Sequence, residues 1–187
     1  MATETYTLER LIADLDRITR EETSPYAITE RAAPLLARLV NNPSSIPAEY
    51  RRPPAHGGRG RYMLHRAPRF NVTAVIWRPG DKAGAHNHDT WGVIGVIDNE
   101  IEETRYRVSG GAPGARATLE VKQVFRHRPG AVSCLVPDDE VHAMHNPTAR
   151  DTAEIHVYGR DLAGLRRKTW APDGTETPLV SPKYLNC

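Results

Sequence analysis

From about residue 61 onward, the sequence consists of short strand-like segments separated by turn-forming residues. Short strands at this spacing are typical of antiparallel sandwiches and jelly-roll barrels, so we predict a mainly β body. Asp98-Asn99 is expected to form a hairpin turn, and Gly110–Gly114 a loop between two hairpin arms. The candidate strands are residues 61–66, 71–78, 91–98, 100–108, 117–126, 131–136, 141–145, 152–159 and 165–170.

The first 42 residues have the periodicity of helices instead. Ser24 and Pro25 are expected at the N-cap and the first position of the second of two helices, which ends before Pro43. The expected inward residues are Leu8, Leu11, Ile12, Leu15 and Ile18 in the first helix and Ile28, Ala32, Leu35, Leu36 and Leu39 in the second. We predict one domain over residues 1–187, with a helical segment (1–42), a β-barrel (61–171) and a C-terminal tail (172–187).

Composition is typical of a single compact domain. The chain has 187 residues, of which 39% are hydrophobic and 26% charged, enough for one domain with a sizeable core. Its net charge is +2 and its arginines are dispersed, so no basic patch for nucleic acid is predicted. Two cysteines form no disulfide framework, and we find no signal peptide or membrane-length apolar segment. We therefore expect a cytoplasmic protein with no nucleic-acid or membrane partner and no obligatory protein partner.

Three histidines stand in a two-part pattern that predicts a metal site. His86 and His88 are separated by one residue, and His142 follows 54 residues after His88. Residues i and i+2 of a strand face the same side, so the first two can both point into a barrel. His145 competes with His142, but in a strand it would face the opposite side. Neutral imidazole suits iron, copper, nickel and zinc, so we predict that these three histidines bind a divalent metal.

The residues around these histidines resemble the cupins, which are jelly-roll β-barrels (double-stranded β-helices). Their first motif supplies a His-x-His pair and their second supplies one more His; here Gly80 precedes the first, and Pro137 and Asn146 flank the second. The usual cupin Glu after the pair is absent, because Asp89–Ile94 contains no Glu and Asp89 should point away. A three-His site without a carboxylate leaves more positive charge and open positions on the metal, which suit an anionic ligand plus dioxygen.

Two segments are similar to the bacterial thiol dioxygenases of the cysteine dioxygenase family. They are residues 86–97 (HNHDTWGVIGVI) and residues 155–159 (IHVYG), and the resemblance covers nearly the whole chain. The run Trp91–Gly95 is most similar to the 3-mercaptopropionate branch, and Trp91 is expected beside the metal ligands. The resemblance implies non-haem Fe(II), which binds a thiol as thiolate, and oxidation of that thiol by O2 to the sulfinic acid. Three imidazoles also accept Ni(II), Cu(II) and Zn(II).

In this family a Ser-x-His-x-Tyr relay borders the iron, and the matching residues here are Glu154, His156 and Tyr158. Strand alternation puts all three on one face. Glu154 departs from the family's Ser, and a carboxylate there would fix the tautomer of His156. The alternative is a buried His–Tyr hydrogen bond that serves structure alone. Mammalian-type members carry a Cys that crosslinks to the Tyr, but Gly92-Val93 stand at that position, so we expect Tyr158 to be unmodified.

Arginine is the natural partner for the carboxylate of a small thiol, through bidentate charge-assisted bonds. Arg61 resembles the carboxylate-binding Arg of cysteine-specific members, and Arg167 resembles the Arg that the 3-mercaptopropionate branch uses. Either could instead be an ordinary solvated side chain. The resemblance favours 3-mercaptopropionate as substrate, with cysteine as an alternative and with mercaptosuccinate if both arginines bind carboxylates.

Two other functions fit a three-His cupin. One is an oxygenase that cleaves carbon–carbon bonds in diketones, and the other is a non-enzymatic cupin that binds a ligand. His156 and Tyr158 favour the thiol dioxygenase over both.

Overall fold

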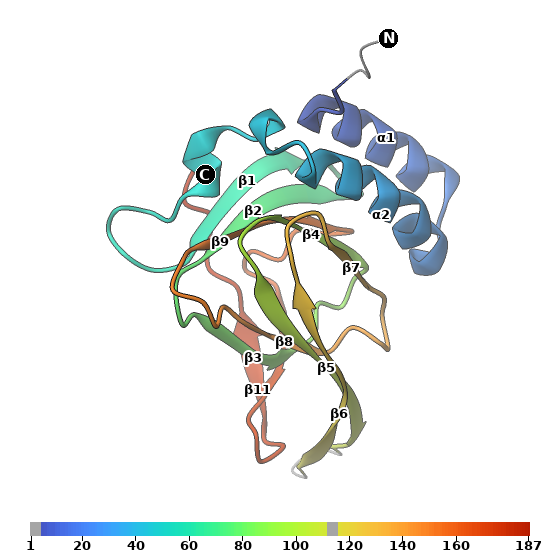
Figure 1. Ribbon diagram of the computed structural model, residues 1–187. Coiled ribbons are helices and arrows are strands. Elements are labelled where there is room, and N and C mark those ends of the chain that lie inside the picture. Colours follow the sequence, from blue (N-terminus) through green and yellow to red (C-terminus); the bar gives the residue numbers. More distant parts are fainter. Residues whose placement is uncertain (1–4, 112–115) are drawn as a thin grey trace.

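The computed structural model describes residues 5–111 and 116–187, which form two antiparallel sheets facing each other (Figure 1). One sheet has the order β1 (Gly60–Arg66), β2 (Asn71–Trp77), β9 (Thr152–Tyr158), β4 (Gly92–Asp98), β7 (Val132–Leu135). The other has the order β11 (Glu176–Val180), β10 (Arg166–Trp170), β3 (Lys82–His86), β8 (His142–His145), β5 (Ile101–Gly110), β6 (Ala117–His127). This arrangement is a jelly-roll (double-stranded β-helix) with two N-terminal helices, and the predicted fold class is confirmed.

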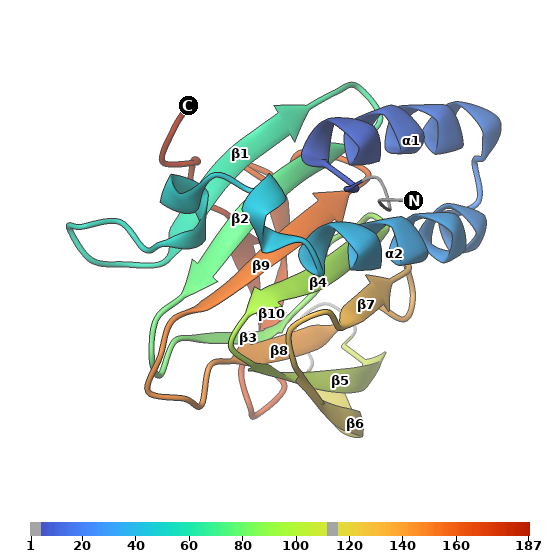
Figure 2. The ribbon, with the colours of Figure 1, turned by 45° about the horizontal axis from the view of Figure 1, so that its top comes forward.

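Two helices, α1 (Leu8–Glu21) and α2 (Pro25–Val40), cover the outer face of the five-stranded sheet (Figure 2). Two short 3-10 helices, Pro43–Ser45 and Ala48–Arg51, follow them. Gly95 on β4 permits the close approach of α2, because a Cβ there would lie 2.8 Å from Val40 and 3.0 Å from Leu36. Pro25 opens α2 as predicted, but the Ser24 side chain makes no capping hydrogen bond. Within the described residues, no helix has the length and apolarity needed to cross a membrane.

Alternation along β2 and β9 separates the core from the barrel interior. Val72, Ala74 and Ile76 pack with Ile155 and Val157 beneath the helices. The intervening residues of β9 pair with residues of β2 that lie on the same face, since the register joins Thr73 to His156 and Val75 to Glu154. The predicted common face of Glu154, His156 and Tyr158 is therefore the one toward the second sheet.

One of the two predicted hairpin connections is wrong. Asp98-Asn99 does not close a hairpin, because β4 pairs with β7 and β9 while β5 pairs with β6 and β8, so this turn carries the chain from one sheet to the other. β5 and β6 do form a hairpin, with Gly110 opposite Ala117, whereas residues 112–115 of its predicted loop lie outside the described residues.

Two strands are absent from the predicted set. β3 has the sequence KAGAH, which is poor in the β-branched and aromatic residues that indicate strands. β11 lies in the segment predicted as a C-terminal tail and contains Pro178. That proline is tolerated because β11 is the edge strand of its sheet.

Candidate metal centre

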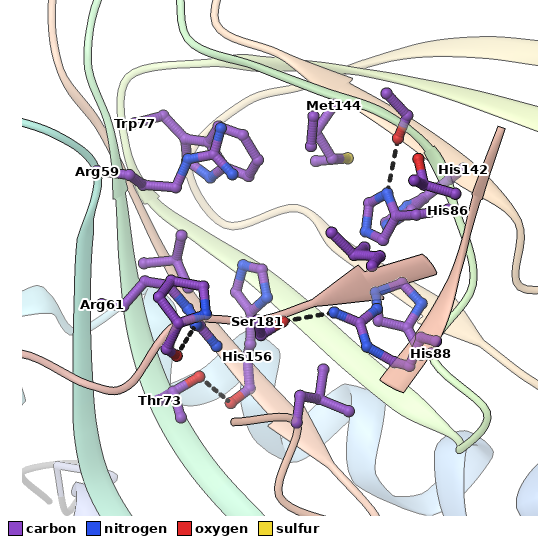
Figure 3. Close-up of a pocket in the computed structure, with 18 of the residues that line it drawn as sticks. Arg59, Arg61, Thr73, Trp77, His86, His88, His142, Met144, His156 and Ser181 are labelled. Carbon is purple, nitrogen blue, oxygen red and sulfur yellow. Dashed lines mark hydrogen bonds between the residues drawn. The ribbon is translucent and has the colours of Figure 1, made fainter. Parts of the chain in front are cut away.

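His86, His88 and His142 come together at the barrel interior, as predicted (Figure 3). One ligand atom from each lies within 4.8 Å of those of the others. The ring centroids are 4.8 Å (His86–His88), 4.9 Å (His86–His142) and 5.0 Å (His88–His142) apart. His88 and His142 are buried, and His86 is partly buried. Imidazoles this close can share one metal ion.

The backbone route to this cluster differs from the predicted one. His86 is the last residue of β3 and pairs directly with His142 of β8, after a bulge between Ala83 and His86. His88 lies beyond the strand, so it reaches the cluster from a turn rather than by strand alternation. Asp89, which follows, has a left-handed backbone (φ 54°) and is exposed, pointing away as predicted.

Asn87, between the two histidines, anchors this turn to β10. Its Oδ1 accepts a hydrogen bond from the backbone N–H of Lys168 at 2.8 Å, and its Nδ2 donates to Asp89 at 2.6 Å. Its carbonyl accepts a hydrogen bond from Arg167. Because both faces of the turn are held, His88 has a fixed approach to the cluster.

Hydrogen bonds at Nδ1 fix the orientation of two rings. The Nδ1 of His86 lies 2.8 Å from the carbonyl of Gly84, and the Nδ1 of His142 lies 2.7 Å from Oε1 of Glu103. A carbonyl or carboxylate partner requires a proton on Nδ1, so Nε2 of each ring keeps its lone pair for a metal. Burial, followed by the charges of the neighbouring histidines, lowers the pKa of His86 and of His88 well below the usual value. Both are therefore neutral at pH 7.

Two buried glutamates stand behind the histidines, and neither was predicted. Glu103 accepts from His142, His127, Ser133 and Arg105 at 2.7–2.8 Å. Although burial alone would raise the pKa of Glu103, these hydrogen bonds, with His127 and His142 first, hold it below its usual value.

Glu140 supports the His88 turn in the same way. Its carboxylate accepts from the backbone N–H groups of His88 (2.9 Å) and Asp89 (3.0 Å), and it lies 3.6 Å from Nδ1 of His88. Burial raises the pKa of Glu140 against these backbone hydrogen bonds. The glutamate of the usual cupin motif is absent, but these two carboxylates contact the histidines from behind.

Glu154, His156 and Tyr158 are hydrogen-bonded in series along β9, and we refer to these three residues as the relay. Nδ1 of His156 lies 2.9 Å from the Tyr158 hydroxyl, and Nε2 lies 3.1 Å from Oε2 of Glu154. Trp77, which was not predicted, donates to the same Glu154 oxygen at 2.6 Å. A carboxylate partner places a proton on Nε2, so in neutral His156 the Nδ1 accepts the hydrogen bond from Tyr158.

The Tyr158 ring connects this relay to the histidine cluster. It stacks on His88 with centroids 5.1 Å apart and an interplanar angle of 17°. Gly92 also lies against this ring, since a Cβ there would be 2.7 Å from Cε1 of Tyr158. Burial raises the pKa of the Tyr158 hydroxyl, which is therefore protonated at pH 7. A larger residue at position 92 would collide with the Tyr158 ring.

His156 and Tyr158 of the relay line one cavity of about 640 Å³ together with the histidine cluster. Both predicted arginines line it: Arg61, whose guanidinium donates to the carbonyl of Pro182 at 2.5 Å, and Arg167, which is 5% exposed and donates to Ser181 at 2.5 Å. A third arginine, Arg59, was not predicted; its guanidinium carbon lies 3.6 Å above the centre of the Trp77 ring.

Two predicted or competing residues lie elsewhere. Trp91, expected beside the ligands, instead packs in the hydrophobic core beneath the helices and is not among the described residues that line the cavity. Gly92 faces Tyr158 on the interior side of the sheet, so Trp91, the residue before it, faces the opposite side, toward the helices. His145 contacts Glu102 at 3.9 Å and is not part of the histidine cluster.

The chain is similar to solved cupin structures at low sequence identity. One is a cupin superfamily protein from Desulfitobacterium hafniense (14% identity, TM-score 0.44, 64% of this chain and 88% of that one). Another is an uncharacterized protein with a double-stranded β-helix domain from Klebsiella pneumoniae (18% identity, TM-score 0.44, 71% of this chain and 93% of that one). A third is a Cupin 2 conserved barrel domain protein from Salinispora arenicola (18% identity, TM-score 0.41, 58% of this chain and 87% of that one). No family model matches the sequence.

Proposed function

We propose that this protein is an Fe(II)-dependent dioxygenase that converts a small carboxylate-bearing thiol to its sulfinic acid with O2. The observation that carries the proposal is one cavity lined by three convergent imidazoles, by arginines, and by His156 and Tyr158, with Glu154 hydrogen-bonded to His156 behind them. A cupin that binds a ligand without turnover has no need for a tyrosine held by a histidine at that cavity. The resemblance to the 3-mercaptopropionate branch makes this thiol the first substrate to test.

The donor set fits a divalent transition metal. Neutral imidazoles with free Nε2 atoms suit iron, and carboxylates hydrogen-bonded behind histidine ligands are the usual support of such sites. His86, His88 and His142 would hold the ion. When bound, Fe(II) would supply a Lewis-acidic centre that favours the thiolate and allows reaction with O2.

The residues of the cavity have separable roles in this proposal. Arg167 would bind the substrate carboxylate, because its buried guanidinium keeps an Nε without a hydrogen-bond partner. Tyr158 would hold a proton beside the reacting sulfur, with His156 fixing the hydroxyl's direction. The apolar wall that includes Leu162 and Met144 would limit the access of water.

Oxygen consumption by the iron-loaded protein tests the proposal. The substrates are 3-mercaptopropionate, L-cysteine and mercaptosuccinate, with 2,4-pentanedione to detect a diketone-cleaving oxygenase. We expect O2 uptake with a thiol and formation of its sulfinic acid in equal amounts. Uptake with the diketone alone, or with none of the four, would contradict the proposal.

A further inference from the structure

Three guanidinium groups line one cavity that contains a single acidic residue among its described lining. Arg59, Arg61 and Arg167 contribute the positive charges, and Asp81 is the acid. Asp81 is already engaged, because its carboxylate accepts the backbone N–H of Arg78 at 2.9 Å. The cavity therefore has more cationic than anionic groups, and this excess favours an anionic ligand.

Arg59 is held in place by the cavity wall itself. Its guanidinium stacks on Trp77 and donates to the carbonyl of Lys82 at 3.0 Å. Its Nε is buried without a hydrogen-bond partner among the described residues, and the nearest carboxylate oxygen, on Asp81, lies 3.9 Å away. A planar, stacked guanidinium with an unused N–H is preorganised for a carboxylate.

Arg167 presents the same feature at a different position. It is buried, its Nε also lacks a partner, and its strand pairs with β3 so that Thr169 lies opposite His86. Arg59 and Arg61 instead lie across the cavity from His86 and His88 (Figure 3). The unpaired donors are therefore located on two walls, one beside the histidines and one facing them.

The arginines also destabilise one another in the absence of a ligand. Burial lowers the pKa of Arg59 and of Arg167. Asp81 offsets part of this at Arg59 and Tyr158 part of it at Arg167, while the charge of Arg61 lowers both. Anions on both walls would relieve this repulsion, whereas a single carboxylate at Arg167 would leave Arg59 with only Asp81, at 3.9 Å, as a counter-charge.

We infer that the substrate carries two carboxylates, one bound by Arg167 beside the metal ligands and the second bound by Arg59 against Trp77. This inference rests on the proposed function for the thiol and refines its substrate class to dicarboxylate thiols. Arg59, placed by Trp77, is then the residue that discriminates dicarboxylate from monocarboxylate thiols.

The kinetic test compares kcat/KM for mercaptosuccinate with that for 3-mercaptopropionate. We expect the wild type to prefer the dicarboxylate, and Arg59→Gln to lower the ratio of the two values by about 10- to 100-fold, as for loss of a charge-assisted hydrogen bond. Arg59→Lys should give an intermediate ratio, because it keeps the charge but not the planar stack. Arg166→Gln, an exposed neighbour of Arg167 on the same strand, is the matched control and should leave the ratio unchanged. A wild-type preference for 3-mercaptopropionate, with an Arg59→Gln ratio equal to wild type, would overturn the inference and leave the proposed function intact.

A binding measurement separates the inference from the proposed function. Calorimetric titration of the Zn(II)-loaded protein with succinate and propionate, at equal ionic strength, requires no turnover. We expect succinate to bind more tightly, and Arg59→Gln to remove that advantage. Succinate binding that depends on Arg59 without turnover of any thiol would support a dicarboxylate site and refute the dioxygenase. Equal binding of both acids by the wild type would refute the site.

Discussion

Glu103 offers the sharpest test of how this centre is held together. It is 1% exposed, and both of its oxygens accept two hydrogen bonds, Oε1 from His142 and Arg105 and Oε2 from His127 and Ser133. In Glu103→Gln the amide oxygen can still face His142 while the new NH2 group faces Ser133, which can accept. This variant therefore removes the charge and keeps most of the geometry, whereas Glu103→Ala removes both.

The expected magnitudes follow from these contacts. Loss of a partner behind a metal-bound histidine costs about 10- to 100-fold in metal affinity. We therefore expect metal affinity to fall about 10-fold in Glu103→Gln and about 100-fold in Glu103→Ala. The metal-free protein should lose about 1.5–3 kcal/mol in free energy of unfolding with Gln. With Ala the loss should be about 3–5 kcal/mol, because Arg105 is left without its buried carboxylate.

Competition for Zn(II) against a chromophoric chelator measures the affinity, and urea unfolding of the metal-free protein measures the stability. The matched control is Glu102→Gln, one position along β5, whose side chain is 32% exposed beside Arg126 and His145. The Zn(II) affinity and the free energy of unfolding of Glu102→Gln should both stay within experimental error of wild type. If both Glu103 variants bind Zn(II) as tightly as wild type, Glu103 does not support the histidine cluster.

The remaining predictions address pH, the ligands, the relay and the packing. Because the folded pKa of Glu103 lies below its usual value of 4.5, its stabilisation is complete above that pH and is lost as the pH falls below it; Glu103→Gln should flatten the unfolding free energy against pH in that acid range. His142→Ala should abolish iron retention, measured by metal analysis, whereas His145→Ala should retain iron; the reverse result would show that the wrong histidine was assigned. Tyr158→Phe should lower kcat by roughly 10- to 1000-fold with iron content unchanged, and intact mass of the wild type should show no loss of two hydrogens to a thioether. Gly95→Ala should destabilise the protein by about 1–3 kcal/mol in urea unfolding, because its Cβ would overlap α2; a wild-type midpoint would show that the helix can move away freely.

Local periodicity was sufficient to predict one half of the site. Strand alternation over residues 154–158 correctly placed Glu154, His156 and Tyr158 on a common face, because β9 is regular throughout. For His88 the predicted position in the cluster is right but the route is not, since β3 ends at His86, is bulged before it, and leaves His88 in the following turn. In a β-bulge, one strand has an extra residue relative to its partner strand. No local pattern in the sequence indicates where this occurs.

Other residues of the site were not predictable because their roles come from long-range pairing. Glu103 meets His142 only because β5 lies beside β8, and the predicted hairpin at Asp98-Asn99 would have put β5 in the wrong sheet. Arg59 and Trp77 reach the cavity from the connection before β1 and from the end of β2, neither of which has a motif. Trp91, in contrast, was expected beside the metal ligands, although alternation from Gly92 already indicates that it faces the helices.

The absent motif carboxylate and the excess of arginines belong to one charge arrangement. A glutamate bound directly to the metal would offset part of the ion's charge and occupy a position that substrate and dioxygen need. Here the compensating carboxylates, Glu103 and Glu140, contact the histidines from outside the cavity, so they support the ligands without occupying that space. The cavity side consequently remains cationic, with Arg59 and Arg167 each keeping an unused donor. A neutral substrate would gain nothing from this field, whereas an anionic one would gain on both walls, which is why substrate charge is the property most open to test.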